Sequence, residues 1–175
     1  MTIKDLPQRE PTAGTGKGVL YLQFRLNDQR FALDVREIVE VLALRTLKPI
    51  AQAPGWVRGI LSHRGALIPV IDLAALSFAM PAAARTSTRL VVVRYHPAAS
   101  ATALHLGLIL EQATETLRCQ PDEFQPYGLD NGEAPYLGPV RQDAQGMLQR
   151  IEVDQLLCDE VRRLLFPDAP AQVPA

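Results

Sequence analysis

The sequence contains few of the residues that build disulfide or metal frameworks. It has two cysteines, Cys119 and Cys158, which lie too far apart for CxxC spacing. A disulfide framework and a zinc knuckle are therefore excluded, and we expect two inert, partly buried thiols. The three histidines, His63, His96 and His105, share no ligand spacing, so no metal site is predicted.

The sequence also lacks an excess of charge of one sign. Its 18 basic and 19 acidic residues give a net charge of −1, so no overall field attracts nucleic acid or anionic lipid. No apolar run approaches the roughly 18 residues that span a bilayer, and residues 1–18 lack the apolar core of a signal peptide. We expect a cytoplasmic protein with no nucleic-acid partner and no direct membrane insertion.

Catalytic motifs are missing as well. The chain contains no GxGxxG, P-loop, GxSxG or HExxH string. Gly14 and Gly16 faintly resemble a phosphate loop, but only a polar arm precedes them where that loop requires a strand. We therefore predict no catalytic residue, no cofactor and no metal, which argues against an enzyme.

Hydrophobic residues make up 47% of the chain, enough for a sizeable core, and most of them follow a strand pattern. Apolar residues alternate along residues 20–26, Asn27-Asp28 supplies a turn, and the alternation resumes at Phe31, which predicts a hairpin. Residues 56–71 predict a second hairpin around Arg64-Gly65, because Gly65 can adopt the positive φ of a tight turn.

Between these hairpins the pattern changes to that of a helix. Asp34 is a candidate N-cap, and Glu37 follows three residues later as in a capping box. Apolar residues then recur at helical spacing, namely Val35, Ile38, Val41 and Leu42. We expect one or two helical turns with an apolar stripe, which either packs into the core or faces a partner.

The second half repeats the short strands and ends in a helix. Strands are predicted near residues 90–93, 104–119 and 147–153, and an amphipathic helix from Asp154 ends before Pro167. We divide the chain into a flexible arm (1–18), one domain of two sub-barrels (19–166, hinge at about 77–89) and a disordered tail (167–175). Many short strands and few helices predict a mainly β fold of paired small barrels.

Several strings occur in an order typical of one family. The chain reads FRLND at 24–28, FALD at 31–34 and RGILSHRGALIPVIDL at 58–73, and its second half has GLILE at 107–111. Tyr136-Leu137-Gly138 and Met147-Leu148 follow at the positions of a closing hairpin. In this succession the chain resembles the CheW family of chemotaxis coupling proteins.

The resemblance implies a fold and a scaffold function. The fold is two intertwined five-stranded SH3-like barrels with short helices, a C-terminal helix and a hydrophobic groove between the barrels. The groove would bind the cytoplasmic tip of a methyl-accepting chemoreceptor, and other surfaces the regulatory domain of a CheA-type histidine kinase. The protein would then be recruited to membrane receptor arrays. The matching receptor positions are Leu22, Val35, Ile38, Glu40, Val41 and Arg64, and we assign Arg58, Gly59 and Gly65 to the kinase.

The chain departs from the family pattern at three places, one of which is the last strand, where Gln149 and Arg150 stand in a segment that is apolar in the family. Ser62-His63 replaces the usual Asn-Leu, and Glu111-Gln112 replaces the usual Asp-Gly. The strings TSTRLVVVRY and APYLGPVRQDAQGMLQ are similar to Wsp-type coupling proteins of surface-sensing pathways. On the groove interpretation, Ile38→Asp abolishes receptor binding without unfolding the protein.

Alternatives remain open from the residues themselves. Arg64 could simply cap the turn beside Gly65, and Trp56 could be a core residue or an interface anchor. A small-barrel ligand sensor or enzyme could reuse the fold, and a closed pocket with convergent polar groups would indicate one.

Overall fold

The computed structural model describes residues 3, 8–9, 17–97 and 102–167, so most of the predicted arm and nearly all of the predicted tail lie outside the described residues. The helices are α1 (Leu73–Phe78) and α2 (Asp159–Leu165), with 3₁₀ turns η2 (Val35–Glu37), η3 (Pro121–Glu123) and η4 (Val153–Gln155). The strands are β1 (Gln8–Arg9), β2 (Val19–Leu26), β3 (Gln29–Asp34), β4 (Ile38–Ala43), β5 (Val57–His63), β6 (Ala66–Asp72), β7 (Arg89–Tyr95), β8 (Leu104–Cys119), β9 (Leu137–Asp143) and β10 (Gly146–Ile151).

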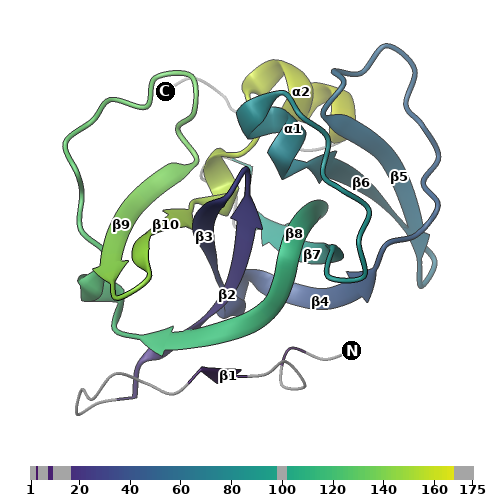
Figure 1. The fold of residues 1–175 in the computed structure, drawn as a ribbon. Coiled ribbons are helices and arrows are strands. Elements are labelled where there is room, and N and C mark those ends of the chain that lie inside the picture. Colours follow the sequence, from purple (N-terminus) through teal and green to yellow (C-terminus); the bar gives the residue numbers. More distant parts are fainter. Residues whose placement is uncertain (1–2, 4–7, 10–16, 98–101, 168–175) are drawn as a thin grey trace.

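The strands form two five-stranded barrels that share β8 (Figure 1). Barrel A has the strand order β8–β2–β3–β10–β9, and barrel B has the order β4–β7–β8–β6–β5. In each barrel the successive pairings are antiparallel, antiparallel, parallel and antiparallel, so the two barrels have the same topology. The predicted fold of two intertwined five-stranded barrels is confirmed.

The chain passes between the barrels in two matching places. The turn η2 leads from β3 in barrel A to β4 in barrel B. Strand β8 pairs with β7 up to Leu110 and with β2 from Glu111 onward, and a bulge at Gln112 (φ 48°) marks the change. The predicted hinge at about 77–89 is wrong, because this segment connects α1 to β7 within barrel B and carries no passage between barrels.

Carboxylates hold that segment in place. Asp72 Oδ2 accepts a hydrogen bond from the Ala82 backbone N–H at 2.8 Å, and Glu111 Oε1 accepts one from Ala83 at 3.0 Å. The prediction of a hinge was based on the alanine-rich composition of the segment alone. The two carboxylates that hold it lie outside the segment, so the sequence did not indicate them as its partners. Both acceptors become neighbours only through the folded topology.

The predicted helical stripe is mostly a strand. Only η2 is helical, and Asp34 caps it as expected by accepting a hydrogen bond from the Arg36 N–H at 2.9 Å. From Ile38 the chain continues as β4, which pairs with residues 89–93 of β7. Ile38, Val39 and Val41 are β-branched, which favours the strand once this partner is present. The C-terminal helix also begins later than predicted, at Asp159, and ends two residues before Pro167.

Three hydrophobic clusters fill the molecule. One lies inside barrel B and includes Leu42, Leu61 and Leu90, and one lies inside barrel A and includes Tyr21, Leu117 and Cys119. The largest cluster, the central core, joins residues of both barrels to α1, η4 and α2. Burial raises the pKa of Cys119 to about 11, consistent with the inert thiol we expected, whereas Cys158 is exposed rather than partly buried.

Candidate partner-binding surface

The structure places most of the predicted groove residues in the central core. Leu22 and Val41 have no exposed surface, and Ile38 is 8% exposed. Side chains from α1, η4 and α2 cover the region between the barrels that the resemblance implied would be an open groove. Leu22 and Val41 are therefore core residues in this conformation. Val35 is half-buried at the edge of the same cluster.

The charged residues that were singled out do meet at the surface. Glu40 on β4 forms an ion pair with Arg64, which lies in the β5–β6 turn, at an Oε1–Nη2 distance of 3.2 Å. His63 Nε2 lies 2.8 Å from Glu40 Oε2, and Arg45 Nη1 lies 3.2 Å from His63 Nδ1. We call these four residues the Glu40 cluster. The sequence pointed to Glu40 and Arg64, flagged His63 only as a departure, and contained no signal for Arg45.

The strand pattern places the Glu40 cluster at one end of barrel B. Leu42 and Leu61 point into the interior of barrel B. Glu40 lies two residues before Leu42 on β4, and His63 lies two residues after Leu61 on β5. Side chains two residues apart on a strand project to the same face, so Glu40 and His63 close the end of the barrel interior. Their side chains are 20% and 12% exposed, whereas Arg64 is 76% exposed and can reach a partner.

The two contacts of His63 assign a role to each nitrogen of its ring. An arginine side chain can only donate, so His63 Nδ1 accepts from Arg45. Its Nε2–H then donates to the Glu40 carboxylate. This hydrogen bond, and then the charge of Arg64, lowers the pKa of Glu40 below its ordinary value of 4.5.

The fold itself explains why glycine stands at the two positions assigned to kinase binding. Arg64 and Gly65 both have positive φ, at 50° and 77°, which is the geometry of a two-residue hairpin turn. Gly59 has φ 137°, and the Lys48 carbonyl oxygen lies only 2.3 Å from the position of an added Cβ. Of the three residues, Arg58 alone presents an exposed side chain.

Exposed apolar side chains flank the Glu40 cluster along the chain. Val39 precedes Glu40 and is 39% exposed, and Leu67 follows the turn on β6 and is 72% exposed. Large apolar side chains left in water beside a charged group are typical of interface residues. Trp56 is partly buried and packs against the central core.

Glu37 is a second titratable group near the predicted groove. Burial raises its pKa from 4.5 to about 7, and the neighbouring carboxylates of Asp34, Asp154 and Glu152 act in the same direction. The folded state therefore binds more protons than the unfolded state between pH 4.5 and 7, and the free energy of unfolding falls as the pH rises through this range.

We expect Glu37→Gln to remove this fall. The variant should be more stable than the parent by about 1–2 kcal/mol at pH 8 and nearly equal to it at pH 4.5. The figure for pH 8 is smaller than the full pKa shift would give, because Glu37 is partly exposed to solvent. Urea denaturation at the two pH values measures this difference. The lowered pKa values of Glu40 and Asp143 act at pH 4.5 and below, so they leave the comparison unaffected. An equal effect of Glu37→Gln at both pH values would contradict the raised pKa.

Two further observations concern the described residues. No group of three or more histidine, cysteine, aspartate and glutamate side chains among them is arranged to hold a metal ion. None of the helices in the described ranges is long and apolar enough to cross a membrane.

Comparison with known proteins identifies the family. A family model described as a CheW-like domain matches residues 20–161. The chemotaxis protein CheW of Rhizobium meliloti (strain 1021) is 27% identical over 112 residues, which cover 64% of this chain and 68% of the relative. The chemotaxis protein CheW of Klebsiella aerogenes is 22% identical over 162 residues, which cover 87% and 90% of the two chains.

The fold has a solved counterpart. The crystal structure of the scaffolding protein TtCheW from Thermoanaerobacter tengcongensis matches with a TM-score of 0.70 at 19% identity, covering 85% of this chain and 93% of that one. The double barrel is thus an architecture that this chain shares with TtCheW. The family match over most of its length shows that this chain belongs to the CheW family, and it is accordingly a chemotaxis-type adaptor and not an enzyme.

Proposed function

We propose that this chain couples the cytoplasmic tip of a methyl-accepting chemoreceptor to the regulatory domain of a CheA-type histidine kinase. It would act in the cytoplasm, recruited to membrane receptor arrays, within a surface-sensing pathway of the Wsp type. The observation that carries the proposal is the Glu40 cluster, an ordered ionic group with exposed apolar neighbours on a chain of this family.

The receptor contact follows from the exposed residues rather than the buried ones. A helical hairpin is recognised through apolar anchors one turn apart, for which Val35 and Val39 supply accessible surface. Arg64 would then pair with an acidic side chain of the receptor, which sets orientation more than affinity. Such a contact is weak alone, and neighbours in an array strengthen it by raising the effective concentration.

The kinase contact is assigned to the outer side of the β5–β6 hairpin. Arg58 lies there with an exposed side chain, and the two glycines hold the hairpin in shape. The likeness to Wsp-type proteins rests on the strings at 86–95 and 134–149. It is the basis for proposing a surface-sensing pathway, because adaptors of different pathways must discriminate between different partners.

Reversing the charge of Arg64 tests the proposal. We expect Arg64→Glu to weaken co-elution with the receptor tip by about tenfold or more, because the new carboxylate repels the acidic receptor side chain with which Arg64 would pair. Arg163→Glu, the same charge reversal at an exposed arginine of α2, is the matched control and should bind normally. The readout is co-elution with the receptor hairpin and with the kinase regulatory domain from the same genome.

The control for folding is the thermal melt of both variants, which should stay within a few degrees of that of the parent because an exposed ion pair contributes little to stability. Failure of the parent protein to bind either partner at about 100 μM, where interactions of only ~5 kcal/mol are detected, would overturn the coupling proposal.

A further inference from the structure

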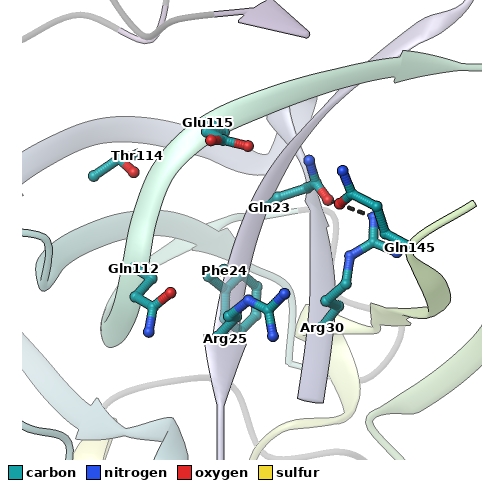
Figure 2. A pocket seen from close by; sticks show the side chains of 8 residues that line it. All are labelled: Gln23, Phe24, Arg25, Arg30, Gln112, Thr114, Glu115 and Gln145. Carbon is teal, nitrogen blue, oxygen red and sulfur yellow. Dashed lines mark hydrogen bonds between the residues drawn. The ribbon is translucent and has the colours of Figure 1, made fainter. Parts of the chain in front are cut away.

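A polar pocket opens at the end of barrel A (Figure 2). Its volume is about 250 Å³. Side chains from β2, β3, β8 and the β9–β10 turn line it, namely Gln23, Phe24, Arg25, Arg30, Gln112, Thr114, Glu115 and Gln145. Seven of these eight residues are polar, so water or a polar group is the natural occupant.

The pocket lies where barrel B carries the Glu40 cluster. Glu40 pairs with Val92 directly after a bulge in the β4–β7 ladder, and Glu115 pairs with Gln23 beside the bulge in the β8–β2 ladder. Two positions further on, Leu42 and Leu117 enter the interiors of their barrels. The two glutamates therefore occupy equivalent positions in the repeated topology.

The two barrel ends are filled differently. In barrel B, His63 and Arg64 of the hairpin turn reach Glu40 and occupy the end. In barrel A, Asp143 of the equivalent turn instead binds Arg30 at 2.8 and 3.0 Å and Arg141 at 2.9 Å. The chain thus supplies no turn cation to the end of barrel A, and the space stays open.

One cation in this pocket has no anionic partner among the residues that the structure describes. Arg30 is saturated by Asp143 and by Gln23, whose Oε1 accepts at 2.8 Å. Arg25 donates to the Asp28 carbonyl oxygen at 3.2 Å, and within the described ranges no carboxylate forms an ion pair with it. Its guanidinium keeps further N–H donors in a planar fork that suits the two oxygens of a carboxylate.

We propose that this pocket is a binding site for a carboxylate group. Arg25 supplies the charge-assisted hydrogen bonds, and the side-chain amides of Gln112 and Gln145 at the exposed rim donate to the same group. Glu115 also lines the pocket, but it is engaged in an interaction of its own. A cavity of this volume admits either a small free dicarboxylate or one acidic side chain of a bound protein. The site is separate from the Glu40 cluster, so the inference is independent of the coupling function.

A titration of the whole chain with glutarate tests the site, followed by ¹H–¹⁵N NMR. Glutarate should shift the backbone amides of the lining residues in a saturable way, whereas the neutral isostere glutaramide should not. Arg25→Gln should weaken glutarate binding by about tenfold, the loss of one charge-assisted pair. Arg118→Gln is the matched control, an exposed arginine on β8 outside the pocket that donates to the Gly18 carbonyl oxygen.

Co-elution with the kinase domain and the receptor tip separates the two sources of the carboxylate. If Arg25→Gln also weakens one complex and glutarate competes with it, the natural occupant is an acidic side chain of that protein. If both complexes are unaffected, the site serves a free small carboxylate. Absence of saturable shifts, or equal shifts in Arg25→Gln, would overturn the site, and this result does not depend on whether the partners bind.

Discussion

Replacing Gly59 with alanine is expected to lower the free energy of unfolding by about 3 kcal/mol or more. Gly59 adopts φ 137°, and an added Cβ would lie 2.3 Å from the Lys48 carbonyl oxygen. That oxygen accepts from the Ile60 N–H at 2.8 Å, while Lys48 N–H donates to Ile60 at 3.0 Å. The clash is with backbone atoms, so it is relieved only by breaking the bridge that covers the edge of β5.

Gly55→Ala is the matched control for this prediction. Its Cβ would meet no atom within 4 Å, and its φ lies outside the positive range, so its stability should stay within about 0.5 kcal/mol of the parent. Urea denaturation compares the variants. If Gly59→Ala were as stable as Gly55→Ala, the close approach of Lys48 would be refuted. Loss of kinase binding in Gly59→Ala would report damage to the hairpin and would not identify Gly59 as a contact.

Ile38→Asp is expected to unfold the protein, at a cost of about 4 kcal/mol or more. The groove interpretation of the sequence led to the opposite expectation of a folded variant that cannot bind the receptor. Ile38 is 8% exposed and packs in the central core, so the new carboxylate would be buried without a partner. Thermal melting followed by circular dichroism measures the loss.

Val39→Asp separates binding from folding at the neighbouring position. Val39 is 39% exposed, so its aspartate remains in water and the variant should melt within a few degrees of the parent. A normal melting temperature for Ile38→Asp would contradict the central core assignment and return Ile38 to the partner surface.

Local patterns predicted the hairpins because each of their determinants lies within the turn. Asn27 and Asp28 both adopt positive φ, as do Arg64 and Gly65, and the alternating strands on either side set the register. The Glu40–Arg64 pair was anticipated through family resemblance, not through spacing, since 24 positions separate the two residues.

Features that depend on distant partners were not predictable. The spacing of Val35, Ile38 and Val41 suits a helix, yet β7, some fifty residues later, pairs with this segment and makes it a strand. The contacts at the end of barrel B were equally unpredictable from the sequence. Arg45 and His63 meet because the fold places β5 beside the loop that follows β4. The hinge prediction was wrong for the same reason: composition showed small residues but not the carboxylates that anchor them.

The shared strand β8 has a mechanical consequence. Its first half belongs to barrel B and its second half to barrel A, and η2 makes the reciprocal passage, so each barrel contains a strand that enters from the other. Neither barrel can then melt or fold alone without leaving an open seam in its neighbour, and amide hydrogens in both should exchange as one cooperative unit. A force applied to one barrel would therefore move both barrels together as one rigid body.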